Sequence, residues 1–258
     1  RLLGSDALAL RVVVDLRLPR VIAAIVVGAT LGGAGCVLQM LFANPLVEPG
    51  LIGVSQGAAF GAAFAIVVLS PALWVIQVFA ALFGFGGLVL SYTVARRLRF
   101  GGRILRLILA GIAVSAVFSA GVGLIKFVAD PLSQLPAITF WLLGGLAAVR
   151  WAQLLQAAPV AAGALLVVLA RRWRLNLLSL DDRVSFSLGT APERERLGLL
   201  VAATIATASV ISIAGIIGWV GLLVPHIARR LVGSDGRSVV PASLLLGAVF
   251  TVDRKSVV

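Results

Sequence analysis

Apolar stretches long enough to cross a lipid bilayer recur along the whole of this 258-residue chain. A hydrocarbon core of about 30 Å needs about 20 apolar residues in a helix. Only 12% of the residues are charged, against about 25% in a soluble domain. The chain is therefore predicted to be all-α, a polytopic membrane helix bundle forming a single transmembrane domain over 1–258. The predicted helices lie at about 20–42, 51–70, 73–95, 104–128, 152–170 and 197–217, with a shorter one at 218–232 and another at 239–252.

The net charge of +12 comes from arginines that gather in short clusters between the apolar runs. Such clusters mark cytoplasmic loops by the positive-inside rule and do not indicate a nucleic-acid surface. Placing the first two clusters inside leaves the segment 129–151, which is poor in basic residues, outside. The three clusters are Arg96, Arg97, Arg99, Arg103 and Arg106; Arg171, Arg172, Arg174, Arg183, Arg194 and Arg196; and Arg229, Arg230 and Arg237.

The third cluster is also inside only if the chain crosses the membrane twice between Leu197 and Leu231. One of these crossings must then be short. Glycine tolerates backbone conformations that other residues avoid, so a tight reversal is expected near Gly215, Gly218 and Gly221. Short, broken helices at membrane depth occur where they are buried in protein or line a cavity. This pattern favours a transporter or a channel.

Several chemistries are excluded by what the sequence lacks. No glycine-rich phosphate-binding loop ending in Lys-Ser/Thr is present, so the chain does not itself hydrolyse ATP and is not expected to be an enzyme. The single cysteine, Cys36, rules out an internal disulfide or a cysteine metal site, and we expect it to pack in the core. No cofactor is predicted for this chain. Its acidic residues fall in loops rather than in apolar runs, which argues against an ion-coupled carrier.

Three segments are more specific than composition: residues 17–58, residues 108–120 followed by 140–146, and residues 213–248. The first includes NPLVEPGLIGVSQGA and the last GLLVPHIARRLVGSDGR. In order and over most of the chain, they resemble the FecCD/BtuC-like permeases, the membrane subunits of type II ABC importers for iron–siderophore, haem and cobalamin. The family fold has about ten helices, of which about eight are represented here; on that template the first helix and the C-terminal helices lie outside this sequence.

The resemblance also implies partners and a location. Such permeases work as a homodimer, or with a paralogous permease, in the bacterial cytoplasmic (inner) membrane. Two ATPase subunits, which carry ATP and Mg²⁺, bind the cytoplasmic face. A periplasmic or lipid-anchored substrate-binding protein delivers the cargo from outside.

Site residues carry over from the family at matching positions. Arg17 and Arg20 are expected to dock the binding protein, since guanidinium groups pair well with carboxylates. The segment 171–196 is expected to be the cytoplasmic coupling loop that contacts the ATPase. Within that loop Asp181 replaces the usual glycine and Ser185 the usual alanine, and the family-matched coupling positions are Leu180, Asp181, Asp182, Ser185, Leu188 and Gly189. By the same resemblance, Ile104 and Leu105 are expected at the level of the cytoplasmic gate. A role in core packing is an equally good interpretation of these two residues.

The sole histidine, His226, lies in the helix-end motif formed by Pro225, His226 and Arg229. A metal site or a catalytic site would need further ligands or a nucleophile nearby, and the sequence shows neither. A structural role at a helix end is expected, with a contact to the ATPase as the alternative. Basic residues there also complement the helix dipole.

The predicted function is that of a transmembrane permease subunit of an ATP-driven importer. It would form the translocation path for an iron–siderophore complex, or for haem or cobalamin. A secondary transporter or channel without an ATPase is the alternative. A membrane scaffold that transports nothing is a third possibility.

Overall fold

The computed structural model describes residues 10–255, all of whose regular structure is helical. Six of the helices in this range are long and apolar enough to cross a membrane. The first of them begins with the π-helix η1 (Val12–Arg17) and continues directly as α2 (Leu18–Leu41). The other five are α4 (Leu73–Arg97), α5 (Arg103–Val128), α7 (Trp151–Arg171), α10 (Pro192–Ala214) and α12 (Gly236–Lys255).

Shorter helices fill the connections. They are η2 (Pro49–Ile52), α3 (Val54–Phe64) with its extension η3 (Ala65–Leu69), α6 (Gln134–Leu143), α8 (Arg174–Leu178), α9 (Asp182–Ser187) and α11 (Val220–Val232). The helix α6 lies in the segment 129–151, where the sequence predicted only an external connection. With ten residues it is too short to span a bilayer.

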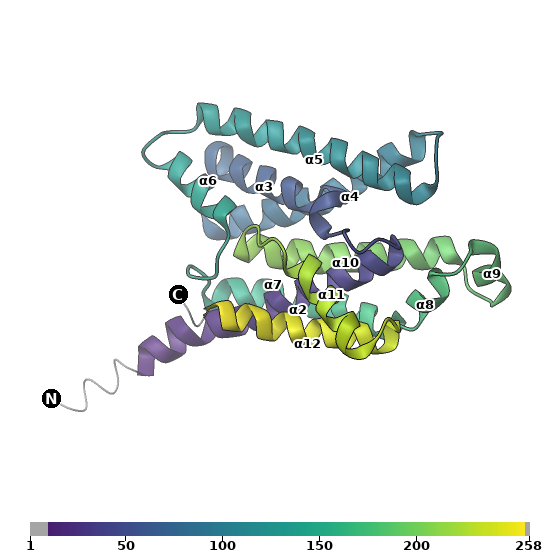
Figure 1. The fold of residues 1–258 in the computed structure, drawn as a ribbon. Coiled ribbons are helices and arrows are strands. Elements are labelled where there is room, and N and C mark those ends of the chain that lie inside the picture. The colour runs from purple at the N-terminus through teal and green to yellow at the C-terminus, as the bar shows by residue number, and fades with distance from the viewer. Residues whose placement is uncertain (1–9, 256–258) are drawn as a thin grey trace.

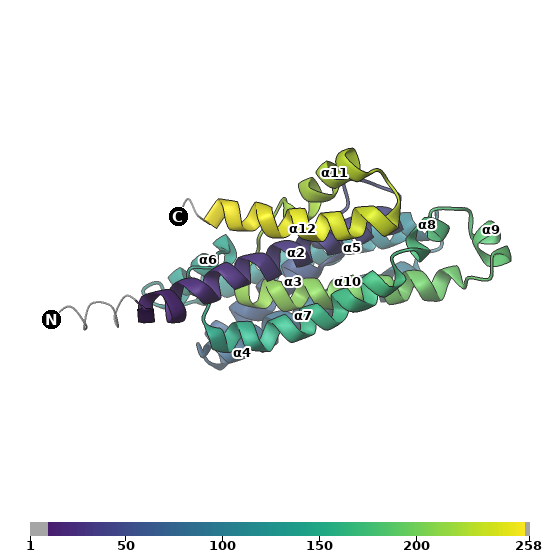
Figure 2. The same cartoon turned by 90° about the horizontal axis from the view of Figure 1, so that it is seen from below.

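Helix α2 is the centre of the bundle. Figure 2 shows it between α12 on one side and α7 and α10 on the other, and Figure 1 shows α3, α4 and α5 as a second layer against this group. Small residues allow the close approach: a Cβ on Gly28 would collide with the backbone of Gly247, and one on Gly32 with the carbonyl of Ser243. Small residues at such helix contacts are the usual solution in membranes.

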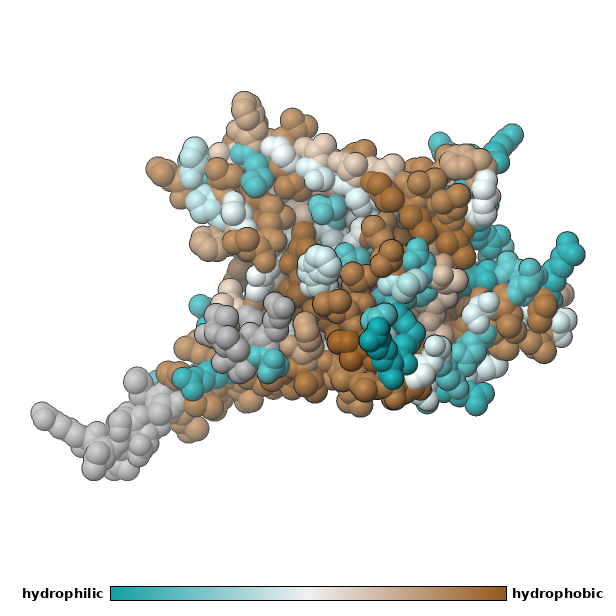
Figure 3. All heavy atoms as spheres, in the orientation of Figure 1, coloured by the Kyte–Doolittle hydropathy of each residue, from teal (hydrophilic) through white to brown (hydrophobic). Residues whose placement is uncertain are grey.

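Apolar side chains cover the flanks of the bundle. In Figure 3 brown surface spreads over most of the visible face, while hydrophilic residues concentrate at one end. On α5, for example, Val117 and Leu124 are more than two-thirds exposed. Exposed apolar residues on this scale require an apolar surrounding or a protein partner, as expected for a membrane bundle.

The three arginine clusters meet at one end. Arg103 from the first cluster pairs with Glu193 at the start of α10 across 3.4 Å. Asn176, near the second cluster, donates a 2.7 Å hydrogen bond to Asp235, beside the third. The segment 129–151 is joined to the opposite end, where Gly145 N–H donates to the carbonyl of Ala214 at the end of α10. The contacts thus place the clusters at one end and the segment 129–151 at the other, as the charge pattern predicted.

The short crossing is α11, which has 13 residues. The chain leaves α10 at Gly215 and reaches α11 at Val220 through an unwound stretch in which Gly215 (φ 68°) and Trp219 (φ 70°) have left-handed backbones. Gly221, expected in the reversal, instead lies in the first turn of α11, packed against Gly35 of α2.

Candidate functional site

The predicted coupling loop folds into two short helices, α8 and α9, that project beyond the bundle at the arginine end (Figure 1). Asp181 caps α9, its side chain accepting a 2.9 Å hydrogen bond from the backbone N–H of Arg183. Aspartate is among the preferred N-cap residues, which explains why it can replace glycine at this position. Ser185 is fully buried and donates to the carbonyl of Leu177 at 2.5 Å. The turn after α9 ends at Gly189 with φ 80°.

Polar contacts fix this projection to the bundle. Arg196 of α10 pairs with Asp182 at 2.5 Å and donates to the carbonyl of Leu178 at 2.9 Å. Arg174 pairs with Glu195. Asp235 accepts hydrogen bonds from the Asn176 side chain and from the Arg237 backbone, which lower the pKa of its carboxyl and keep it ionised. The two short helices are therefore held in a defined position.

The outer surface of this projection is apolar. Four apolar residues of this projection are exposed to a large degree. Their exposed fractions are 42% for Leu180, 47% for Val184, 71% for Phe186 and 56% for Leu188. A polar end of the molecule that presents such residues has the character of a protein-binding surface.

Arg17 and Arg20 lie at the opposite end, where α2 begins (Figure 2). Arg17 is exposed, whereas Arg20 is half-buried and its Nε has no hydrogen-bond acceptor among the described residues. Pro19, between them, is buried in the first turn of α2, a position that suits proline. The indole of Trp151 donates to the carbonyl of Val14 at 3.0 Å, tying this start to α7.

The residues of the helix-end motif lie on two faces of α11, one exposed and one packed against α2. His226 is exposed, whereas Arg229 is half-buried and donates to Gln39 of α2. Pro225 has no N–H to donate to Gly221, four residues earlier. The Gln39 amide supplies the missing donor at 3.2 Å. In the described part of the chain no three His, Cys, Asp or Glu side chains are grouped as metal ligands.

The two residues that the family resemblance predicted near a gate, Ile104 and Leu105, differ in environment. Ile104 is half-buried and packs against the core, while Leu105 is 48% exposed and lies beside Gly101. Ile104 also lines a cavity at the arginine end of the bundle.

A cavity beside Glu48, walled mainly by apolar residues, was not foreseen from the sequence. The segment from Glu48 to Gly53 packs against the middle of α5, with Ser115 donating to the carbonyl of Gly50 at 3.3 Å. Glu48 therefore lies in a loop, as predicted, but at the depth of a helix centre. It lines a cavity of about 330 Å³ together with Ser55, Gln56 and Ser115.

This placement corrects the expectation that no carboxylate occurs at membrane depth. The sequence places Glu48 between two apolar runs, and only the packing of the loop shows that it turns back into the bundle. The sequence feature that could have indicated this loop is the pair Pro45 and Pro49, because two prolines prevent a regular helix in this segment. The argument against an ion-coupled carrier cannot rest on missing carboxylates.

Fold and site together define a multi-pass membrane transport subunit with a projecting helical pair at its basic end. The FecCD transport family model matches residues 2–254, and the chain belongs to this family. An iron chelatin transport system permease protein of Helicobacter pylori is 41% identical over 93% of this chain and 72% of its own length. The molybdate import system permease protein MolB of Haemophilus influenzae is 39% identical over 96% of this chain and 73% of its own length.

A solved structure has the same fold. It is a metal-chelate type ABC transporter in an inward-facing conformation, with a TM-score of 0.89 and 38% identity, covering 97% of this chain and 81% of that one. The predicted family and helix-bundle class are confirmed.

Proposed function

We propose that the chain is the permease subunit of an ATP-driven importer in the bacterial cytoplasmic membrane. It would pair with a second permease, carry two ATPase subunits at its arginine end and receive cargo from a binding protein at the other end. It performs no covalent chemistry; ATP binding and hydrolysis on the partner would drive the alternation between outward- and inward-facing states.

One observation carries this proposal. The pair α8 and α9 is fixed to the bundle by its own hydrogen bonds, yet it turns exposed apolar side chains outward at the basic end. A rigid projection of this kind suits force transmission between subunits, because a flexible loop would absorb the movement. A carrier without an ATPase has no use for it.

Substituting an exposed side chain of α9 tests the ATPase contact. Phe186→Asp should reduce co-purification of the ATPase subunit by about tenfold or more, since a central apolar anchor is worth about 2 kcal/mol or more at an interface. The matched control is Leu132→Asp, an exposed residue at the opposite end, which should retain the ATPase. Equal retention by both variants would disprove the coupling role.

The docking role of Arg17 and Arg20 has its own test. The double substitution to glutamate should weaken binding of the cognate binding protein, and the loss should shrink at high salt because exposed charges are screened. Affinity would be measured on the complex in nanodiscs, with Arg150→Glu, which lies in the segment at the same end of the bundle, as the control. Unchanged affinity would remove these arginines from the docking surface.

For the cargo we propose the iron–siderophore class, supported by the iron chelatin and metal-chelate relatives, with haem and cobalamin as the family alternatives. The relative named for molybdate adds an oxyanion to the range that this fold carries. Uptake into proteoliposomes containing the whole transporter, compared among ferric siderophore, haem, cobalamin and molybdate, would decide. Accumulation without ATP would contradict the importer itself.

A further inference from the structure

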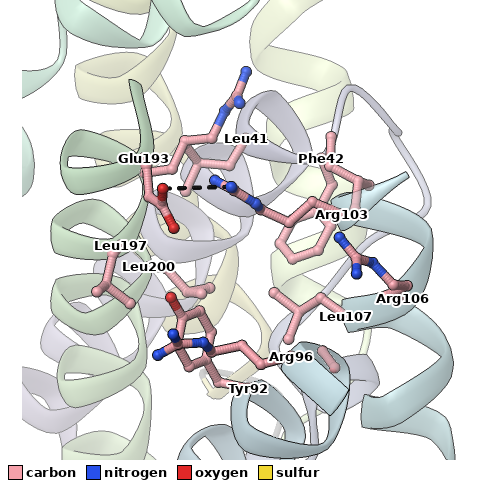
Figure 4. Close-up of a pocket in the computed structure, with 13 residues that line it drawn as sticks. Leu41, Phe42, Tyr92, Arg96, Arg103, Arg106, Leu107, Glu193, Leu197 and Leu200 are labelled. Atoms are coloured by element: carbon pink, nitrogen blue, oxygen red, sulfur yellow. Dashed lines mark ion pairs between the residues drawn. The ribbon is translucent and has the colours of Figure 1, made fainter. Parts of the chain in front are cut away.

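A basic cavity of about 300 Å³ opens at the arginine end of the bundle, between the ends of α2, α4, α5 and α10. Figure 4 shows Arg96, Arg103 and Arg106 around it, with Glu193 paired to Arg103. Arg196 also lines it. Four guanidinium groups thus face a single lining carboxylate.

The positive charge in this cavity is poorly compensated. The Arg103–Glu193 pair joins two side chains that are both more than half exposed, so it neutralises little. Arg196 is paired with Asp182, which is not in the cavity wall, and Arg106 donates to the carbonyl of Leu98 at 2.6 Å.

Two donors in this wall have no acceptor. The Nε groups of Arg106 and Arg196 are buried, and neither has a hydrogen-bond partner among the described residues. A buried donor left unpaired is costly. The cavity is therefore short of negative charge and short of acceptors at the same time.

The rest of the wall is apolar. The buried Leu107 and Leu200 and the more exposed Leu197 line it, and Tyr92 lies close to the end of α4. A tyrosine at a helix end next to arginines is typical of the membrane–water interface. The cavity thus combines a cationic rim with a surface that suits a hydrocarbon chain.

We propose that this cavity binds an anionic phospholipid of the cytoplasmic leaflet, its phosphate held by Arg96 and Arg103 and its acyl chain lying on the leucines. Arginine suits phosphate because its planar donors bind two oxygens at once, and basic pockets between membrane helices bind such headgroups. The site does not depend on the identity of the cargo. Only the choice of leaflet rests on the proposed orientation.

The test measures lipid binding to the purified transporter complex by native mass spectrometry, with phosphatidylglycerol and phosphatidylcholine as probes. The double substitution Arg96→Gln with Arg103→Gln should weaken phosphatidylglycerol binding about thirtyfold. The matched control is Arg97→Gln with Arg194→Gln. It removes the same charge from exposed arginines of α4 and α10 at the same end of the bundle, neither of which lines the cavity, and its binding should stay within about twofold of wild type.

A third variant is expected to strengthen lipid binding instead of weakening it. Glu193→Gln releases Arg103 from its ion pair, so it should tighten phosphatidylglycerol binding. This gain cannot arise from damaged folding. Arg106 and Arg196 are left unchanged because they also hold the backbone.

Four outcomes would overturn the proposal. They are equal losses in the cavity and control variants, equal binding of phosphatidylcholine, displacement of the lipid by millimolar inorganic phosphate, and loss of the ATPase subunit with lipid binding unchanged. The third would make the cavity a site for free anions, and the fourth would assign its arginines to the partner. None of these results would contradict ATP-driven import of the cargo, so the two proposals fail separately.

Discussion

At the scale of single residues, His226 in the helix-end motif is conspicuous in the sequence, whereas the structural contacts around that motif are made by Gln39. His226 attracts attention because it is the sole histidine, yet it is exposed. Gln39 is unremarkable in the sequence, yet it is buried, donates to the backbone of Gly221 and Leu222, and accepts from Arg229. Nothing in the pattern pairs these segments, because the contact depends on how α2 and α11 pack.

Gln39→Leu should therefore destabilise the transporter by about 2–4 kcal/mol. It leaves the Gly221 carbonyl, which Pro225 cannot satisfy, without a donor, and it leaves a half-buried guanidinium without an acceptor. The measurement is thermal unfolding of the purified complex in detergent. His226→Gln, on the outer face of the same helix, should leave the unfolding temperature unchanged. If both substitutions had the same effect, the bridge would contribute nothing.

At the scale of helices, the close contact between α2 and its neighbours depends on glycines, which have no side chain to hold the helices apart. Gly35→Ala would place a methyl group against the backbone of Gly221, and we expect a loss of about 1–3 kcal/mol from overpacking. The same substitution at Gly163, where α7 has open space, should be neutral or gain up to about 1 kcal/mol. Expression level and unfolding temperature of the two variants would be compared. A tolerated Gly35→Ala would show that α2 and α11 can separate.

The same scale marks where sequence reasoning succeeds and where it stops. The long helices were predictable because a bilayer demands long apolar runs, and α5 was foreseen within one residue of its observed bounds, Arg103–Val128. The helix α6 was not, because ten residues flanked by Gly144 and Pro131 carry no length signal. The cavity at Glu48 was also missed, since its wall combines the 48–56 segment with residues of α2, α5 and α10 that only the fold brings together.

At the scale of the whole molecule, the arrangement is polar along one axis. One end gathers the three arginine clusters, the projecting pair α8 and α9 and the basic cavity. The other end carries Arg17, α6 and the segment 129–151 (Figure 1). Positive residues concentrate on the cytoplasmic side of membrane proteins, so the charge rule predicts that the end where the contacts gather the arginines faces the cytoplasm.

Cysteine labelling tests this orientation directly. In a Cys36→Ala background, which removes the one native thiol, Arg183→Cys on α9 and Leu132→Cys before α6 place single thiols at opposite ends on exposed positions. A membrane-impermeant maleimide should label Leu132→Cys in right-side-out vesicles and Arg183→Cys in inside-out vesicles, because neither reagent nor thiol crosses the hydrocarbon core. Lysed vesicles, in which both should react, control for burial. Labelling of both positions from one side would contradict the single crossing expected between them. It would also exclude the proposed contact of α8 and α9 with a cytoplasmic ATPase.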